Sequence, residues 1–194
     1  MEPLVHYHQL VARVDSFFER VSSTHASDIN CGPGCSDCCH SRFSVTAMEA
    51  QVIVQELAGL APATRERLRQ RAEAGDPARC AALDDQGLCE IFSVRPLICR
   101  SHGLPIRCSA PDDEAPPASS PVGERDASGR LHLQIIEVCP KNFQRGLDHV
   151  ASSDMLDQTT VSTVLAAIDA VHCDSSGLSR GSRFDLAELL AQTW

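Results

Sequence analysis

Four cysteines lie within nine residues near the start of the chain, in the order Cys31-Gly-Pro-Gly-Cys35-Ser-Asp-Cys38-Cys39. Thiolates two or three residues apart on a turn-forming segment can converge on one metal ion, because a turn aims successive side chains inward. Gly32 and Gly34 allow the backbone conformations that such a loop needs. Their amide groups can also hydrogen-bond to sulfur and stabilise the thiolate form. The segment therefore predicts a metal site.

Further cysteines follow at wider spacing. Cys80 and Cys89 flank the turn sequence Asp84-Asp85-Gln86-Gly87, which predicts a short hairpin or loop with one cysteine on each arm. Cys99 comes ten residues after Cys89, and Arg95 and Arg100 stand where a guanidinium could offset thiolate charge. Cys139-Pro140 resembles the Cys-Pro ending of bacterial ferredoxin ligand runs.

These blocks resemble a known family of cysteine-cluster proteins. The residues concerned are Cys-x3-Cys-x2-Cys-Cys with Phe43–Ala50, then Gly87–Gly103 around Cys89-Glu-Ile-Phe-Ser-Val-Arg-Pro-Leu-Ile-Cys99-Arg, and Cys139-Pro-Lys-Asn142-Phe143. The pattern is similar to the putative zinc- or iron-chelating domain (YkgJ-like, CxxCxxCC type), with Phe92 where that family usually has Tyr. The resemblance covers residues 31–143 and implies a metal-chelating module. The ligands that it implies are Cys31, Cys35, Cys38, Cys39, Cys80, Cys89, Cys99 and Cys139.

Other potential ligands remain open. Cys108 and Cys173 lie outside these motifs and are expected to be small, partly buried side chains. His40 follows the first cluster and His102 follows Cys99, so either could supply a nitrogen ligand, although a surface histidine is the simpler expectation at both positions.

The number of thiols does not select the metal. Thiolates favour zinc, Cu(I) or iron–sulfur clusters over Mg²⁺ or Ca²⁺. Eight thiolates suit two Cys₄ zinc sites, a dinuclear zinc cluster or iron–sulfur clusters equally well. We expect a zinc- or iron-binding protein with a structural or metal-handling role. The alternative is an iron–sulfur redox protein or enzyme, related to the cysteine domain of flagellin lysine methylase proteins.

Composition excludes several classes. Ten cysteines in 194 residues is a high proportion, while 43% hydrophobic and 22% charged residues are ordinary for a globular protein. No apolar run is long enough to span a bilayer, and the first residues lack the pattern of a signal peptide, so we expect a cytoplasmic protein without membrane contact. A net charge of −9 disfavours nucleic acid as a partner. The metal ion is the one partner that the sequence predicts.

The elements that must position the cysteines are mostly helical. Apolar spacing of three and four predicts a helix over 4–22, and Thr46 and Glu49 form a capping box that starts a helix ending near 59. Further helices are expected from Pro62 to about 75, from 153 to 172, and after Asp185. Residues 131–138 fit a strand or a helix equally well. Residues 110–130, rich in Pro, Ser and acidic residues, are expected to be a flexible insertion. The prediction is a mainly α, small single-domain protein (1–194) with central cysteine-rich loops organised around a metal site.

Overall fold

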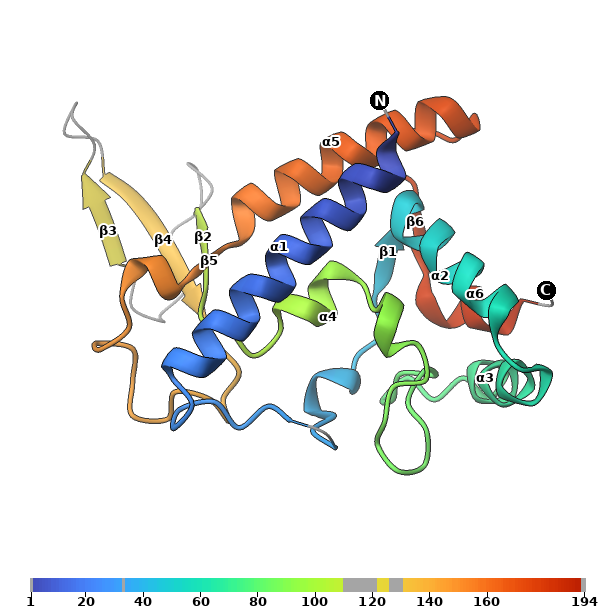
Figure 1. Ribbon diagram of the computed structural model, residues 1–194, viewed down its shortest axis with the longest axis horizontal. Coiled ribbons are helices and arrows are strands. Elements are labelled where there is room, and N and C mark those ends of the chain that lie inside the picture. Colours follow the sequence, from blue (N-terminus) through green and yellow to red (C-terminus); the bar gives the residue numbers. More distant parts are fainter. Residues whose placement is uncertain (1, 33, 110–121, 126–130, 193–194) are drawn as a thin grey trace. The chain divides into compact units, whose positions relative to one another are not determined.

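The computed structural model describes residues 2–32, 34–109, 122–125 and 131–192 (Figure 1). The chain divides into two compact units, which are described separately. Unit 1 comprises Met1–Val11, Gly32–Arg100 and Leu165–Trp194, and unit 2 comprises Ala12–Cys31 and Ser101–Val164. The predicted mainly α fold is confirmed in class, with six α-helices among the residues described. That the whole chain forms one domain around a metal site stays a prediction.

Three helices that lie wholly in unit 1, together with a two-stranded sheet, form its framework. Helix α2 (Ala47–Gly59) starts at the predicted capping box, in which Thr46 accepts from the backbone of Glu49 and the Glu49 side chain accepts from that of Thr46. Helix α3 (Pro62–Ala74) has proline in its first turn and is capped at its end by Gly75, whose φ of 68° suits a helix terminus. Helix α6 (Leu186–Ala191) is capped by Asp185.

The core of unit 1 lies between these helices and the strands beside them. Strand β1 (Ser44–Thr46) pairs antiparallel with β6 (Arg183–Asp185), which brings the end of the chain to the start of α2. Apolar residues of α2, α3 and α6 pack together as one cluster, and Figure 1 shows the three helices close to one another. Cys80 and Cys89 pack against this cluster, so the core itself holds two of the predicted ligands in place.

Short elements connect the cysteines of unit 1. They are the 3₁₀-helices η1 (Asp37–Cys39) and η2 (Phe92–Val94), and helix α4 (Leu97–Ser101), whose last residue falls in unit 2. The helix α4 was not expected, because five residues are too few to show an apolar period.

Unit 2 contains a four-stranded sheet in the order β3-β4-β2-β5 (Figure 1). Strand β4 (Leu131–Glu137) pairs antiparallel with β2 (Ile106–Ser109) and with β3 (Val122–Arg125). Strand β5 (Leu156–Asp157) pairs parallel with β2. The segment 131–138, left open by the sequence, is therefore a strand. The predicted insertion 110–130 lies outside the described residues except for β3, which is ordered into the sheet.

Two long helices each contribute to both units. Helix α1 (Pro3–Thr24) and helix α5 (Gln158–Ser176) confirm the helices predicted over 4–22 and 153–172. Helix α5 starts five residues later than predicted, because the residues before it form η3 (Ser152–Asp154) and β5. Within the described ranges, no helix has the length and apolar character that crossing a bilayer requires.

Candidate metal centre

Five cysteines of unit 1 form a group of thiols, here called the unit 1 thiol group: Cys38, Cys39, Cys80, Cys89 and Cys99. They come from three separate segments of the chain. A charge on Cys38 raises the pKa of each of the other four, so the five sulfurs are near enough to act on one another. The fold thus gathers thiols that are up to 61 residues apart in the sequence, from Cys38 to Cys99.

Backbone contacts hold the first two segments together. The N–H of Cys80 donates to the carbonyl of Cys39 at 2.7 Å, which ties the turn after Cys80 to η1. The loop between Cys80 and Cys89 is closed by Asp84, whose Oδ1 accepts from the backbone of Gln86 and of Leu88. Leu83 and Cys89 form a β-bridge, as expected for the predicted loop with a cysteine on each arm. The turn therefore fixes the position of both sulfurs.

The third segment is held by a buried carboxylate. Glu49 lies in the first turn of α2, and its Oε1 accepts from the N–H of Leu97 at 3.0 Å. That N–H belongs to the first turn of α4, two residues before Cys99. Because the other oxygen of Glu49 completes the capping box with Thr46, one side chain orients both α2 and the helix that carries Cys99.

Their surroundings favour the neutral form of these thiols. Burial raises the pKa of Cys80 and Cys89, and burial together with the neighbouring sulfurs raises the pKa of Cys99 to about 12. A hydrogen bond with Cys38 and burial raise the pKa of Cys39. A bound cation reverses this balance, because a coordinating thiol is deprotonated. The group therefore has the donor chemistry of a site for a soft or borderline cation.

Arg95 is one of the cations that act on this group, as is Arg71, whose charge opposes the rise in the pKa of Cys80. The charge of Arg95 opposes the rise in the pKa of Cys89, as the sequence predicted for an arginine beside thiolates. The guanidinium lies over the ring of Phe92, 3.8 Å from the ring centroid. Arg100 is buried and donates to the carbonyls of Ser93 and Arg95 at 2.6 and 2.8 Å. Arg100 thus supports the segment that carries Arg95.

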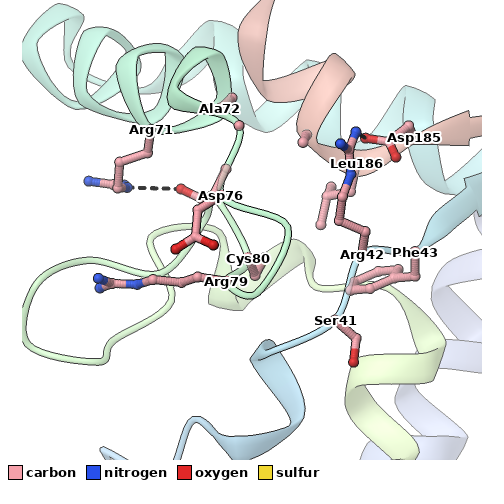
Figure 2. A pocket seen from close by; sticks show the side chains of 13 residues that line it. Ser41, Arg42, Phe43, Arg71, Ala72, Asp76, Arg79, Cys80, Asp185 and Leu186 are labelled. Carbon is pink, nitrogen blue, oxygen red and sulfur yellow. Dashed lines mark hydrogen bonds and ion pairs between the residues drawn. The ribbon is translucent and has the colours of Figure 1, made fainter.

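One wall of a surface pocket in unit 1 includes Cys80 (Figure 2). Figure 2 shows Arg71 and Arg79 with Cys80 on one side, and Arg42, Phe43 and Leu186 on the other. The arginines are engaged: Arg42 pairs with Asp185 at 3.0 Å, Arg71 donates to the carbonyl of Ala81 at 2.9 Å, and Arg79 donates to the carbonyl of Asp84. The pocket therefore opens a path from solvent toward Cys80.

Cys31 lies in unit 2, in a different environment. The buried side-chain amide of Asn142 donates to Cys31 Sγ at 3.2 Å and to the carbonyl of Gly103 at 2.7 Å, and its oxygen accepts from the backbone N–H of Asn30. Gly103 has a φ of 99°, and a Cβ there would lie 2.7 Å from the same sulfur. A hydrogen bond to sulfur stabilises the thiolate, so Asn142 prepares Cys31 for a cation.

The remaining cysteines and histidines named from the sequence occupy six further positions. Cys35 is in unit 1, where its N–H donates to the carbonyl of Gly32 at 3.0 Å, and Cys139 is in unit 2, where its carbonyl accepts from the N–H of Asn142. Cys108 lies in β2 opposite Ile135. Cys173 is fully buried in α5, with its sulfur 3.8 Å from Asp169. His40 contacts the carbonyl of Ala78, and His102 is exposed.

All ten cysteines lie in the part of the chain that the structure describes, and all ten are free thiols. Within that part, one set of three His, Cys, Asp or Glu side chains has its ligand atoms all within 4.8 Å of one another, and it contains no cysteine. The structure therefore shows a cysteine-rich domain and not a closed thiolate site. The eight-cysteine ligand set stays a prediction.

Sequence reasoning missed two residues that position the thiols. Asn142 was recognised as part of a motif. Its hydrogen bond to Cys31 joins residues that are 111 positions apart, and a contact at that separation produces no pattern in the local sequence. Glu49 was recognised as a helix cap, and only the fold shows that its second oxygen holds α4.

Comparison with known proteins finds one family model that matches the cysteine-rich segment. Residues 30–114 match the model of the CxxCxxCC family, described as a putative zinc- or iron-chelating domain. The match includes the first two cysteine blocks and ends before Cys139 and Asn142. No curated protein and no solved structure matches the chain. Over residues 30–114, the chain is therefore similar to the CxxCxxCC family, the putative zinc- or iron-chelating domain.

Proposed function

We propose that this protein binds zinc or iron through its cysteines, with the unit 1 thiol group as the principal binding site. The observation that carries the proposal is the gathering of five thiols from three segments, close enough for the charge of Cys38 to raise the pKa of each of the other four. A cation shared among the sulfurs would offset the burial and mutual repulsion that otherwise keep these thiols protonated. The family description of the segment agrees with the same donor chemistry.

The sulfurs of this group differ in their access to solvent, which supports a metal-handling role beside a structural one. Cys38 is exposed, and Cys80 lines the surface pocket. Cys89 and Cys80 are packed against the core. A group with both anchored and accessible thiols can keep its geometry while it exchanges metal with a donor or an acceptor. We place this activity in a reducing compartment such as the cytoplasm, where thiols persist.

Cys31 and Cys139 enter the proposal as additional thiols in unit 2, together with Cys35 in unit 1. The contact of Asn142 with Cys31 supports a ligand role for that sulfur. We propose that Cys108 and Cys173 do not bind the metal, because Cys108 lies in strand β2 and the side chain of Cys173, in helix α5, is fully buried.

The test is the metal content of the full chain, purified without air and with a reducing agent. Zinc in a colourless protein agrees with the main proposal. Iron with acid-labile sulfide and visible absorption would replace it by the iron–sulfur alternative. Cys38→Ser, Cys89→Ser and Cys99→Ser should each lower the metal-to-protein ratio, because a hydroxyl is a poor ligand for a soft ion.

Two matched controls use the same substitution outside the group. Cys108→Ser and Cys173→Ser should keep the metal content of the unaltered protein. Full metal content in all three variants of the thiol group would show that the thiols gathered in unit 1 are not the ligands.

A further inference from the structure

A second set of potential metal ligands lies in unit 2, and it consists of nitrogen and oxygen donors instead of thiols. The ligand atoms of His25, Asp28 and His149 all lie within 4.8 Å of one another. His25 and Asp28 are buried, and His149 is exposed. This set is here called the His–Asp–His group.

Backbone hydrogen bonds position His25 and Asp28 and join them to the segment before His149. After α1 ends at Thr24, the chain makes a turn in which the N–H of Asp28 donates to the carbonyl of His25 at 2.9 Å. The carbonyl of Asp28 then accepts from the N–H of Phe143 at 2.7 Å, which joins the turn to the segment that carries His149. The ring of Phe143 lies 5.5 Å from that of His25. The group is thus built by the fold and not by chance contact of long side chains.

A second carboxylate orients His25. Its Nε2 lies 3.0 Å from Oδ2 of Asp154, and Arg20 holds Oδ1 of the same carboxylate at 2.5 Å. When a carboxylate accepts a hydrogen bond from one ring nitrogen of a neutral histidine, the lone pair lies on the other ring nitrogen. Most histidines that ligate metals make such a hydrogen bond with the nitrogen that does not bind the metal. In the neutral ring, Asp154 therefore favours the tautomer of His25 in which Nε2 donates and Nδ1 keeps its lone pair for a metal.

The separations suit coordination after a small movement. Nε2 of His149 lies 3.3 Å from Oδ2 of Asp28, and two ligands at about 2.1 Å from a tetrahedral ion are about 3.4 Å apart. Arg145 binds the other oxygen of Asp28 at 2.7 and 3.1 Å, with a side chain that is 70% exposed. Oδ2 thus faces His149 and also accepts a longer hydrogen bond from the Ser27 hydroxyl at 3.4 Å, while Oδ1 is held by Arg145.

We propose that His25, Asp28 and His149 form a binding site for a divalent first-row transition metal such as Zn²⁺ or Fe²⁺. Two imidazole nitrogens and one carboxylate oxygen suit these ions and leave further coordination positions open. The exposed ring of His149 places the open side toward solvent. This proposal does not depend on the thiol group, because it uses no sulfur ligand.

An ion-pair network is the competing explanation for the same contacts, since Asp28 also pairs with Arg145. Two variants separate the explanations. His149→Ala removes one ligand from an exposed position and keeps the pair between Asp28 and Arg145. Arg145→Ala removes that pair and keeps all three ligands.

The experiment follows the histidine ring nitrogens of the ¹⁵N-labelled full chain by NMR while Zn²⁺ is added. Zn²⁺ should shift the ring nitrogens of His25 and His149 together, and His149→Ala should bind zinc at this site at least tenfold more weakly and lose the response of His25. Arg145→Ala should keep both responses. The matched control His8→Ala, an exposed histidine in α1, should behave as the unaltered protein.

The same titration of Cys89→Ser tells the two proposals apart. If the histidine response persists there while total zinc falls, both sites exist independently. Ring nitrogens of His25 and His149 that do not respond to Zn²⁺ would overturn the proposal and leave an ion-pair network only. Loss of the response in Arg145→Ala with its retention in His149→Ala would do the same.

Discussion

At the scale of single residues, charge and hydrogen bonds to sulfur decide how ready the thiols are for a metal. Burial raises the pKa of Cys89, and the charge of Arg95 acts against this rise. Arginine is suited to this role because it stays charged and presents several donors in a fixed fork. Pro96 follows Arg95 and restricts its backbone, which limits the directions that the guanidinium can take.

Arg95→Ala should weaken metal retention about tenfold, as expected for loss of a group that supports ligands without coordinating. Arg95→Lys should restore only part of the retention, because an ammonium cannot reproduce the planar contact with Phe92. The measurement is metal release to increasing chelator. Arg180→Ala, an exposed arginine paired with Asp174, is the control and should leave release unchanged. Equal retention in Arg95→Ala and the control would mean that Arg95 does not affect the site.

Asn142 offers a second prediction, this time about stability. Asn142→Asp replaces a buried donor to Cys31 and Gly103 by a carboxylate, which repels the sulfur and leaves two acceptors without their donor. We expect a loss of about 2–4 kcal/mol in the free energy of unfolding. Gln144→Glu makes the same amide-to-carboxylate change at an exposed position two residues away and should cost less than about 0.5 kcal/mol. Urea unfolding of both variants measures the difference, and equal stabilities would contradict the role given to Asn142.

At the scale of helices and strands, the sequence predicts what is local and misses what is distant. The capping box at Thr46 and Glu49 and the cap at Asp185 place the starts of α2 and α6, because each signal lies within four residues. Strand β4 could not be assigned, since its partners β2 and β3 come from other segments and its own alternation is weak. The thiols follow the same rule: the Cys80–Cys89 loop was predicted, but the contact that holds Cys99 comes from Glu49, far away in the sequence.

Glu49 and Thr46 allow a test of how α2 and α4 are joined. Thr46→Ala removes one cap and should cost about 1 kcal/mol in the free energy of unfolding. Glu49→Ala should cost about 2–3 kcal/mol, because the buried N–H groups of Thr46 and Leu97 both lose their acceptor. Chemical denaturation at neutral pH compares the two variants. A smaller loss for Glu49→Ala than for Thr46→Ala would show that the link to α4 adds nothing to stability.

Asp185 gives the cap of α6 a dependence on pH. Burial raises the pKa of Asp185, but the hydrogen bond from Arg42 and the backbone N–H of Glu188 outweigh it, so that the net pKa lies below its ordinary value. A lowered pKa in the folded state means that the stabilisation is present above about pH 4 and is lost as the pH falls further. Asp185→Ala should therefore cost about 1 kcal/mol near neutral pH, and this cost should shrink below about pH 4.

Unfolding curves of Asp185→Ala at several pH values measure this dependence. Asp174→Ala serves as the comparison, because Asp174 forms only an exposed ion pair with Arg180 and should cost little at any pH. A cost of Asp185→Ala that stays constant through acid pH would mean that its charge does not stabilise the cap.

At the scale of the whole molecule, bound metal should supply much of the order in the cysteine-rich loops. A metal present at about 100 times its dissociation constant adds about 2.7 kcal/mol of stability, which corresponds to roughly 5–10 °C in the melting temperature of a chain of this size. A strong chelator should lower the melting temperature by this amount and speed proteolysis within residues 80–108. Cys89→Ser, with reduced metal content, should respond less to the chelator. A chelated protein that melts as before would show that the metal is not structural.

Gly103 has a consequence for natural variation in this protein. Its backbone lies in the left-handed region at a φ of 99°, and its missing side chain leaves room for the sulfur of Cys31. Movement of the sulfur away from position 103 is opposed by Asn142, whose side-chain amide donates hydrogen bonds both to Cys31 Sγ and to the carbonyl of Gly103. An inherited alanine at position 103 would therefore demand compensating exchanges at 31 and 142, so these three positions should change together in evolution or not at all.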